Sequence, residues 1–313
     1  MKVLSLFDGI ACGLQALKEI NIKVDCYYAS EIDNYAISVA KKRHPEIIHL
    51  GDINNWKSWN INWADIDLII GGSPCQGFSF AGKRLNFSDE RSKLFFCFVD
   101  ILNYIKSYNP EIKFLLENVK MQAECRNHID DLLGVKGVNI NSNIFSAQNR
   151  ERIYWTNIQI KPLPNKSLLV INDIIIESCN QDEQLYISDR HYKAWLKHYN
   201  WKPCNLNEKA KPLLASYFKQ PPHCPYIPYG GEIKDGFSPY RRLSPMECER
   251  LQNLPDNYTL YGINNINISN TQRYKMLGNG WTIGVIKHIL RGLNIEKITL
   301  ESFAELAKQM RHT

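Results

Sequence analysis

The sequence predicts an α/β fold: a Rossmann-like, mostly parallel sheet with helices on both faces, accompanied by a small second domain. Apolar strand-like runs alternate with segments of helical spacing throughout residues 1–157, which requires parallel strands joined by crossover helices. A glycine-containing turn, Asp8–Gly13, separates the first strand from the first helix, as in nucleotide-binding βαβ units. From Lys161 the alternation stops, and aromatic and basic residues interleave as far as about residue 236.

Length and composition set broad limits. The chain has 313 residues, 44% hydrophobic and 22% charged, which is ordinary for a soluble globular protein with a full core. A net charge of +6 is compatible with a polyanionic partner. A basic surface that only contacts solvent would give the same net charge. No apolar run approaches the roughly 18 residues that span a bilayer, so we expect a soluble, cytoplasmic protein without a membrane partner.

Cysteine usage indicates a reducing compartment. The nine cysteines are odd in number and form no C-x-x-C pair, which argues against a disulfide framework. His and Cys do not cluster at metal-ligand spacing, so we expect no metal site.

The first two strands place a candidate ligand site. The strand Lys2–Phe7 leads through the turn into helix Leu14–Ile20, and glycines in such a turn let backbone N–H groups approach a ligand. The glycine spacing is not G-x-G-x-x-G, and glycine here could serve packing alone. The second strand, Cys26–Ser30, ends at Glu31, where a carboxylate can accept hydrogen bonds from ribose hydroxyls. A solvated loop carboxylate is the alternative.

The next strand extends this site. Helix Asn34–His44 stops at Pro45, and a third strand, Glu46–Leu50, ends before Asp52 and Ile53. At that strand end Asp52 can reach the exocyclic amine of an adenine, with Ile53 against the ring face.

The fourth strand delivers a cysteine. The run Leu68–Ile70 ends in two glycines and leads to Ser73-Pro74-Cys75 in a loop. Pro74 fixes its own φ, so the direction of the Cys75 thiol is set before a ligand arrives. The alternative is that Cys75 is a small buried hydrophobe, the commoner role of a cysteine. The following segment, rich in Gly, Ser, Lys and Arg, could close over an anion.

The remaining elements follow the same patterns. Residues 94–105 form one apolar helix face, Phe114–Val119 is a fifth buried strand, and residues 137–145 have period-two spacing before a strand at 153–155. In residues 161–236, interleaved aromatics suit a nucleic-acid surface, although a small core under loops gives the same composition. A helix begins after Ser244, with Pro245 at its first position and Glu247 completing a capping box. Residues 277–286 precede a final helix.

Six short motifs occur in one order along nearly the whole chain: Phe7-Asp8-Gly9, Ser73-Pro74-Cys75-Gln76, Glu117-Asn118-Val119, Gln148-x-Arg150-x-Arg152, Arg242-Leu243-Ser244-Pro245-x-Glu247 and Gly278-Asn279-Gly280. Together they resemble the S-adenosylmethionine-dependent cytosine-5 DNA methyltransferase family. Each motif alone is common by chance, but six in sequence are not. The first loop, with Ala11 and Cys12, is similar to the animal de novo branch, whereas Cys75-Gln76 and the short variable segment are similar to bacterial and phage enzymes.

The resemblance implies the catalytic roles. The Cys75 thiolate adds to cytosine C6 and makes C5 nucleophilic, since a thiolate is a good nucleophile near neutral pH. Glu117 contacts N3 and the exocyclic amine, and Arg152 contacts O2 with Arg150 in support. A surface ion pair with Glu151 is the alternative for either arginine. Because C6 is inaccessible inside a duplex, the cytosine must be flipped out.

The resemblance also implies the binding residues. S-adenosylmethionine is the expected cofactor, held by Phe7, Asp8, Gly9, Ile10, Gly13, Glu31, Ile32, Asp52, Ile53, Pro74, Asn279 and Trp281. The loop from Gln76 to Lys93 is the expected lid, and its DNA contacts are Gln76, Ser79, Lys83, Arg84 and Arg91.

The expected organisation is a catalytic domain at residues 1–160, a target-recognition segment at 161–240 and a C-terminal return at 241–313. Double-stranded DNA is the expected partner. A cognate restriction endonuclease is left open, a monomer is favoured over an oligomer, and a bacterial cell or phage-infected host is the expected setting.

Three rival functions remain at this point. A tRNA cytosine-5 methyltransferase has the same chemistry. A catalytically silent nucleic-acid-binding homologue has the same fold, but it leaves Cys75, Glu117 and Arg152 without a purpose. A dinucleotide oxidoreductase does not explain Pro74-Cys75, and its usual glycine spacing is missing.

Overall fold

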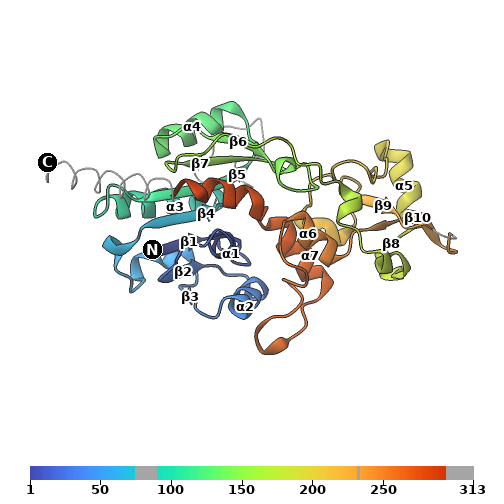
Figure 1. Cartoon of the computed structure of the whole chain (residues 1–313), viewed down its shortest axis with the longest axis horizontal. Coiled ribbons are helices and arrows are strands. Elements are labelled where there is room, and N and C mark those ends of the chain that lie inside the picture. The colour runs from blue at the N-terminus through green and yellow to red at the C-terminus, as the bar shows by residue number, and fades with distance from the viewer. Residues whose placement is uncertain (75–89, 231–232, 294–313) are drawn as a thin grey trace, which may run out of the picture.

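A computed structural model of the chain describes residues 1–74, 90–230 and 233–293, with only the backbone for residues 90–92 (Figure 1). Its larger unit is a seven-stranded sheet flanked by four helices from the first half of the chain and by the C-terminal helical residues 283–293. The strands are β1 Lys2–Leu6, β2 Cys26–Ser30, β3 Ile48–His49, β4 Leu68–Gly72, β5 Lys113–Val119, β6 Val138–Asn141 and β7 Glu151–Thr156. The helices are α1 Cys12–Glu19, α2 Asn34–Arg43, α3 Glu90–Lys106 and α4 Ala123–Leu133.

The strand order is β3-β2-β1-β4-β5-β7-β6. The first five strands in the chain pair in parallel, whereas β7 is antiparallel to both β5 and β6. This confirms the predicted mostly parallel sheet. The chain moves outward in one direction from β1 to β3 and in the other from β4 to β5. A crevice at the carboxyl ends of β1 and β4 is where such sheets bind ligands.

Helices cover both faces of this sheet, and successive strand residues divide between two cores (Figure 1). Val3 and Ile70 pack with α1, α2 and the helical residues 283–293, whereas Leu4 and Ile69 pack with α3 and α4. The alternation follows from the two-residue period of a strand. No helix in the described part of the chain is long and apolar enough to cross a membrane.

Two predicted segments are shorter in the structure. Only Ile48 and His49 of the predicted strand 46–50 pair with β2, because the Ile47 amide donates to His44 in a turn and Glu46 pairs with Lys18. The period-two segment 137–145 becomes β6 followed by a 3-10 turn, Ser142–Ile144. The turn at His44–Ile47 therefore delays the start of β3, and the 3-10 turn ends β6 early.

The smaller unit has its own sheet, ordered β8-β10-β9, with β8 Tyr186–Ser188, β9 Tyr226–Pro228, β10 Phe237–Arg242 and helix α5 Asp189–Tyr199. Most of its aromatic side chains are core. Trp195, Trp201, Tyr217 and Tyr226 are buried, so for them the small-core alternative holds. Tyr199 differs, since it is 54% exposed.

The C-terminal part of the described chain packs back on the large sheet domain (Figure 1). It contains α6 Pro245–Leu251, α7 Asn270–Asn279 and the helical residues 283–293. The Tyr258 hydroxyl donates to the Ile10 carbonyl at 2.9 Å, and Lys275 pairs with Asp33 at 2.7 Å. Helix α6 begins as predicted, since the Glu247 amide donates to Ser244 Oγ and the Ser244 amide to the Glu247 carboxylate.

Candidate active site

A cavity of about 530 Å³ opens at the carboxyl ends of β1, β2, β4 and β5, where the strand order reverses. Most of the predicted site residues within the described chain line it. They are Phe7, Asp8, Gly9, Ile10, Glu31, Ile32, Asp52, Ile53, Pro74, Glu117, Arg150, Arg152, Asn279 and Trp281. The N-terminal half of the chain and the C-terminal return therefore share one cavity.

The loop after β1 has an unusual backbone. Phe7, Gly9 and Ala11 all have positive φ, between 58° and 60°. For a bulky residue such as Phe7 this conformation is strained, and it persists where the surroundings fix it. The Asp8 amide donates to the Ser30 carbonyl at 3.1 Å, and the Tyr27 hydroxyl donates to Asp8 Oδ1 at 2.7 Å. These two bonds hold the strained loop against β2.

One side-chain oxygen of Asp8 accepts no hydrogen bond from the part of the chain that the structure describes. Its side chain is buried, and Oδ2 has no hydrogen-bond partner among the described residues. Burial raises the pKa of Asp8 to about 7, with a smaller contribution from the charge of Glu31, whereas hydrogen bonds from Ser5 and Tyr27 oppose the rise. A buried orphan acceptor on a cavity wall suits a ligand that brings a donor or a positive charge.

Glu31 is more than a solvated loop carboxylate. One oxygen accepts from the Gly9 amide at 2.8 Å, and the other accepts from the amides of Ile32 and Asp33, also at 2.8 Å. The carboxylate therefore links the ends of β1 and β2 at the cavity. Asp52 caps the 3-10 helix Ile53–Ser58, where its Oδ1 accepts from the Asn54 amide at 2.9 Å.

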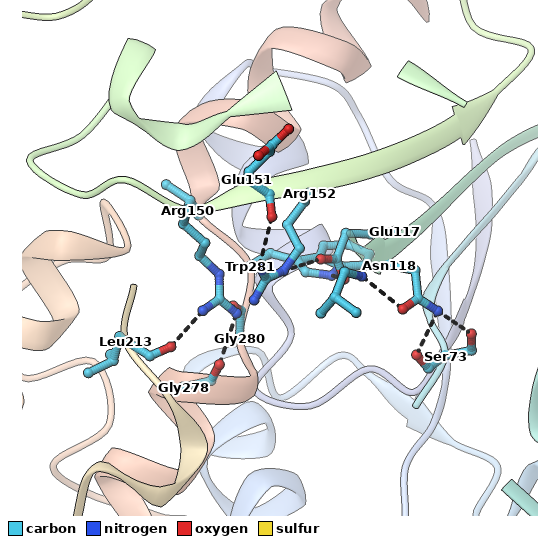
Figure 2. A network of polar contacts seen from close by, with 12 residues as sticks. Ser73, Glu117, Asn118, Arg150, Glu151, Arg152, Leu213, Gly278, Gly280 and Trp281 are labelled. Carbon is cyan, nitrogen blue, oxygen red and sulfur yellow. Dashed lines mark hydrogen bonds and ion pairs between the residues drawn. The ribbon is translucent and has the colours of Figure 1, made fainter. Parts of the chain in front are cut away.

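At the opposite end of the cavity, Glu117 has a partner for each oxygen (Figure 2). Arg152 Nε lies 2.9 Å from Oε1, and the Trp281 indole N–H donates to Oε2 at 3.1 Å. Val119 is opposite Arg152 in the β5–β7 register, so Glu117 and Arg152 are diagonal neighbours on one sheet face. The alternative surface pair with the Glu151 carboxylate does not form. That carboxylate lies 3.5 Å from Lys120 Nζ, and Arg152 donates instead to the Glu151 backbone carbonyl at 2.8 Å.

Arg150 binds backbone rather than a carboxylate (Figure 2). Its buried guanidinium donates to the carbonyls of Leu213 at 2.7 Å, Gly278 at 2.9 Å and Gly280 at 3.2 Å. Burial, followed by the charge of Arg152, lowers the pKa of Arg150 to about 10, so the group stays charged at neutral pH. Arg150 therefore joins β7 to the smaller unit and to the C-terminal return.

Asn118 is a site residue for which the sequence pattern predicted no role. Its Nδ2 donates to Ser73 Oγ at 3.2 Å and to the Ser73 carbonyl at 3.3 Å, which ties the end of β5 to the segment leading to Cys75 (Figure 2). Its place inside the Glu117-Asn118-Val119 motif is the signal that could have pointed to it.

One predicted residue within the described chain does not line the cavity, and six others have side chains outside the described part. Gly13 does not line it, because Gly13 lies under β4, where an added Cβ would be 2.2 Å from Ile70 Cδ1. Cys12 lines the cavity instead, and burial raises the pKa of its thiol to about 12, which makes it a poor nucleophile. Cys75, Gln76, Ser79, Lys83, Arg84 and the side chain of Arg91 lie outside the described residues.

Metal ligands would have to come from clustered acidic, His or Cys side chains. In the described parts of the chain, no group of three or more His, Cys, Asp or Glu side chains could hold a metal ion.

Fold and cavity together define a Rossmann-like protein with a cavity at the switch point of its sheet, where such folds bind ligands. Comparison with known proteins specifies the class. The family model for C-5 cytosine-specific DNA methylases matches residues 1–294. The type II methyltransferase M1.ScrFI of Lactococcus lactis subsp. cremoris is 32% identical over 92% of this chain and 76% of its own length. M.NlaX of Neisseria lactamica, another type II methyltransferase, is 29% identical over 92% of this chain and 94% of its own.

Solved structures agree on the fold. The S. pombe Dnmt2 methyltransferase superposes with a TM-score of 0.71 at 18% identity, covering 95% of this chain and 99% of that one. The Entamoeba histolytica methyltransferase EhMeth gives a TM-score of 0.69 at 18% identity, over 95% and 98% of the two chains. This chain therefore belongs to the C-5 cytosine-specific DNA methylase family and is an enzyme, a DNA (cytosine-5)-methyltransferase.

Proposed function

We propose that the protein transfers a methyl group from S-adenosylmethionine to C5 of a flipped-out cytosine in duplex DNA, through a covalent bond from Cys75 to C6. The observation that carries the proposal is the Glu117–Arg152 pair at one end of the cavity, with Asp8, Glu31 and Asp52 at the other. A carboxyl group and a guanidinium beside a pocket for a nucleoside suit a reaction that places charge on a pyrimidine ring.

The residues at the first end of the cavity fit the cofactor. The orphan Oδ2 of Asp8 would accept from its ammonium group, and the Glu31 carboxylate would accept from its ribose hydroxyls. Asp52 and Ile53 would face the adenine. S-adenosylmethionine supplies an electrophilic methyl group when bound, and the chain's own residues hold it against the sheet edge.

The residues at the second end would activate the base. The Cys75 thiolate adds to C6, and electron density moves to N3 and O2. Glu117 meets N3 and the exocyclic amine, and Arg152 meets O2. C5 then takes the methyl group, with S-adenosylhomocysteine as the leaving group. Water accepts the C5 proton, and the C6–S bond breaks with its electrons returning to the Cys75 thiolate. Arg150 acts in support, by holding three carbonyls on the two backbone segments that frame this end.

The Glu117–Arg152 pair would be shared with the base when the base enters. The 2.9 Å contact joins Nε of Arg152 to one oxygen of Glu117, so other N–H groups of the guanidinium are left to meet O2. Swinging the cytosine out of the duplex costs a few kcal/mol.

The same proposal covers the domain boundaries, the DNA contacts and the biological setting. Residues 1–160 and 241–313 would form the catalytic domain and 161–240 the recognition segment, although β10 runs to Arg242, past that boundary. Gln76, Ser79, Lys83, Arg84 and Arg91 would contact DNA, so salt should weaken binding. Bacterial relatives named as type II methyltransferases support a bacterial or phage setting, with or without a cognate endonuclease.

Transfer of label from methyl-labelled S-adenosylmethionine tests the proposal. We expect transfer to duplex DNA and not to tRNA, with bisulfite sequencing of DNA from expressing cells locating the target. Duplexes containing 5-fluorocytosine should trap a covalent adduct, which Cys75→Ser should not form. Wild-type transfer to tRNA alone would favour the RNA enzyme, and a Cys75→Ser protein of unchanged rate would exclude the covalent route.

A further inference from the structure

We infer that Trp281 is a positioning residue for Glu117, in addition to any contact it makes with the cofactor. This inference rests on the proposed function, in which Glu117 meets the cytosine ring. The indole N–H donates to Oε2 at 3.1 Å, while Arg152 Nε holds Oε1 at 2.9 Å (Figure 2). Two donors on two oxygens fix the plane of the carboxyl group as well as its place.

Of these two donors, Trp281 is the one with no proposed contact to the base. Arg152 is itself assigned to cytosine O2, so when the base enters its guanidinium donates to both Glu117 and the substrate. The Trp281 indole has a single N–H, and its partner is Glu117. This N–H therefore holds Glu117 in place however Arg152 divides its donors.

Gly72 provides the space for this hydrogen bond. A Cβ atom on Gly72 would lie 2.9 Å from Trp281 Nε1 and 3.1 Å from Glu117 Oε2, directly at the contact. Gly72 is also opposite Glu117 in the β4–β5 register. Its φ is not in the left-handed region, so close approach rather than backbone freedom is the reason for glycine here.

The backbone on both sides of Trp281 is anchored. The preceding carbonyl, of Gly280, accepts from Arg150 at 3.2 Å, and the following hydroxyl, of Thr282, donates to Gln252 Oε1 at 2.7 Å. Thr282 and Arg150 are buried. An indole held between two buried anchors has little freedom to move, as a positioning group requires.

Trp281→Phe tests the inference, because it keeps an aromatic ring at the cavity and removes the N–H. We expect kcat for methyl transfer to fall about tenfold to a hundredfold, the range for one hydrogen bond to a charged group. The KM for S-adenosylmethionine should change by less than about threefold. A raised KM with unchanged kcat would overturn the inference and leave Trp281 as a wall of the cofactor site.

A double-mutant cycle separates positioning from general damage. In a Glu117→Ala background, measured by single-turnover transfer of labelled methyl groups, Trp281→Phe should change the rate by less than about twofold. The same fold-loss in both backgrounds would show that Trp281 acts independently of Glu117 and would overturn the inference.

A third measurement does not depend on turnover. In protein labelled with ¹⁵N-tryptophan, the Trp281 indole resonance, assigned by its loss in Trp281→Phe, should shift in Glu117→Ala. Trp155 is the internal control, since its indole donates to the Asp130 carboxylate at 2.7 Å and its resonance should not move. An unmoved Trp281 resonance overturns the inference, whereas a wild-type protein that methylates no cytosine overturns the proposed function.

Discussion

Gly278 and Ala215 are in such close approach that no side chain fits between them. A Cβ atom on Gly278 would lie 2.2 Å from the backbone nitrogen of Ala215. Helix α7 and the 3-10 helix Ala215–Lys219 therefore cross backbone to backbone, and the smaller unit is fixed on the C-terminal return at this point. Arg150 reinforces the crossing, because it donates to the carbonyls of both Gly278 and Leu213.

Gly278→Ala should disturb this crossing. The added methyl group would meet the backbone of Ala215 and not a flexible side chain, so the two helices would have to move apart. We expect the free energy of unfolding, measured by urea denaturation, to fall by about 3 kcal/mol. Gly134→Ala is the matched control. Gly134 has a positive φ of 72° but open space around its Cβ position, so it should lose only about 1 kcal/mol. Equal losses in the two variants would contradict the steric account.

The buried pair Arg241–Glu247 should be costly to break. Both side chains are fully buried, and two hydrogen bonds of 2.8 Å join them. Glu247→Leu leaves the guanidinium without its counter-charge, so we expect the unfolding free energy to fall by about 3–5 kcal/mol. The exposed helix pair Lys193–Asp189 is the control, for which Asp189→Asn should cost at most about 0.5 kcal/mol in the same titration.

Asp8 should make stability depend on pH. Its pKa is about 7 in the folded protein and ordinarily 3.8, so between these values the folded state binds a proton that the unfolded state releases. The stabilisation that the protonated Asp8 contributes to the folded state is therefore full below pH 3.8 and is lost as the pH rises through 7. Over that range the wild type should lose roughly 2–4 kcal/mol relative to Asp8→Asn. Parallel stability curves for the two proteins between about pH 5 and 8 would disagree with the raised pKa.

Asn118 should control the segment that carries Cys75. Asn118→Asp removes the donor to Ser73 while keeping the side chain's shape. On the proposed mechanism we expect kcat to fall at least about tenfold, because Ser73 leads to the proposed nucleophile and would be held less firmly. Ser73→Ala removes the bond to Oγ but leaves the bond to the carbonyl, so its effect should be smaller. The rate of covalent trapping on 5-fluorocytosine DNA measures both. A larger effect from Ser73→Ala would contradict this role.

Local sequence was enough to predict most elements of the large sheet and most of the residues that line its cavity. The capping box of Ser244 and Glu247, and the ends of β2, β4 and β5, depend on interactions within a few residues. Parallel strands bring their carboxyl ends to one edge, which is why the strand pattern alone assigns Glu31 and Glu117 to one cavity.

Which groups meet within that cavity was decided only by the tertiary fold. Trp281 and Glu117 are 164 residues apart, and Arg150 reaches carbonyls from two other segments, so no local pattern predicts these contacts. Gly13 looked like a ligand-loop glycine but supports packing on Ile70. Sequence composition cannot predict which of these residues contact one another, because hydrogen bonds and close packing depend on how distant segments are placed in the final fold.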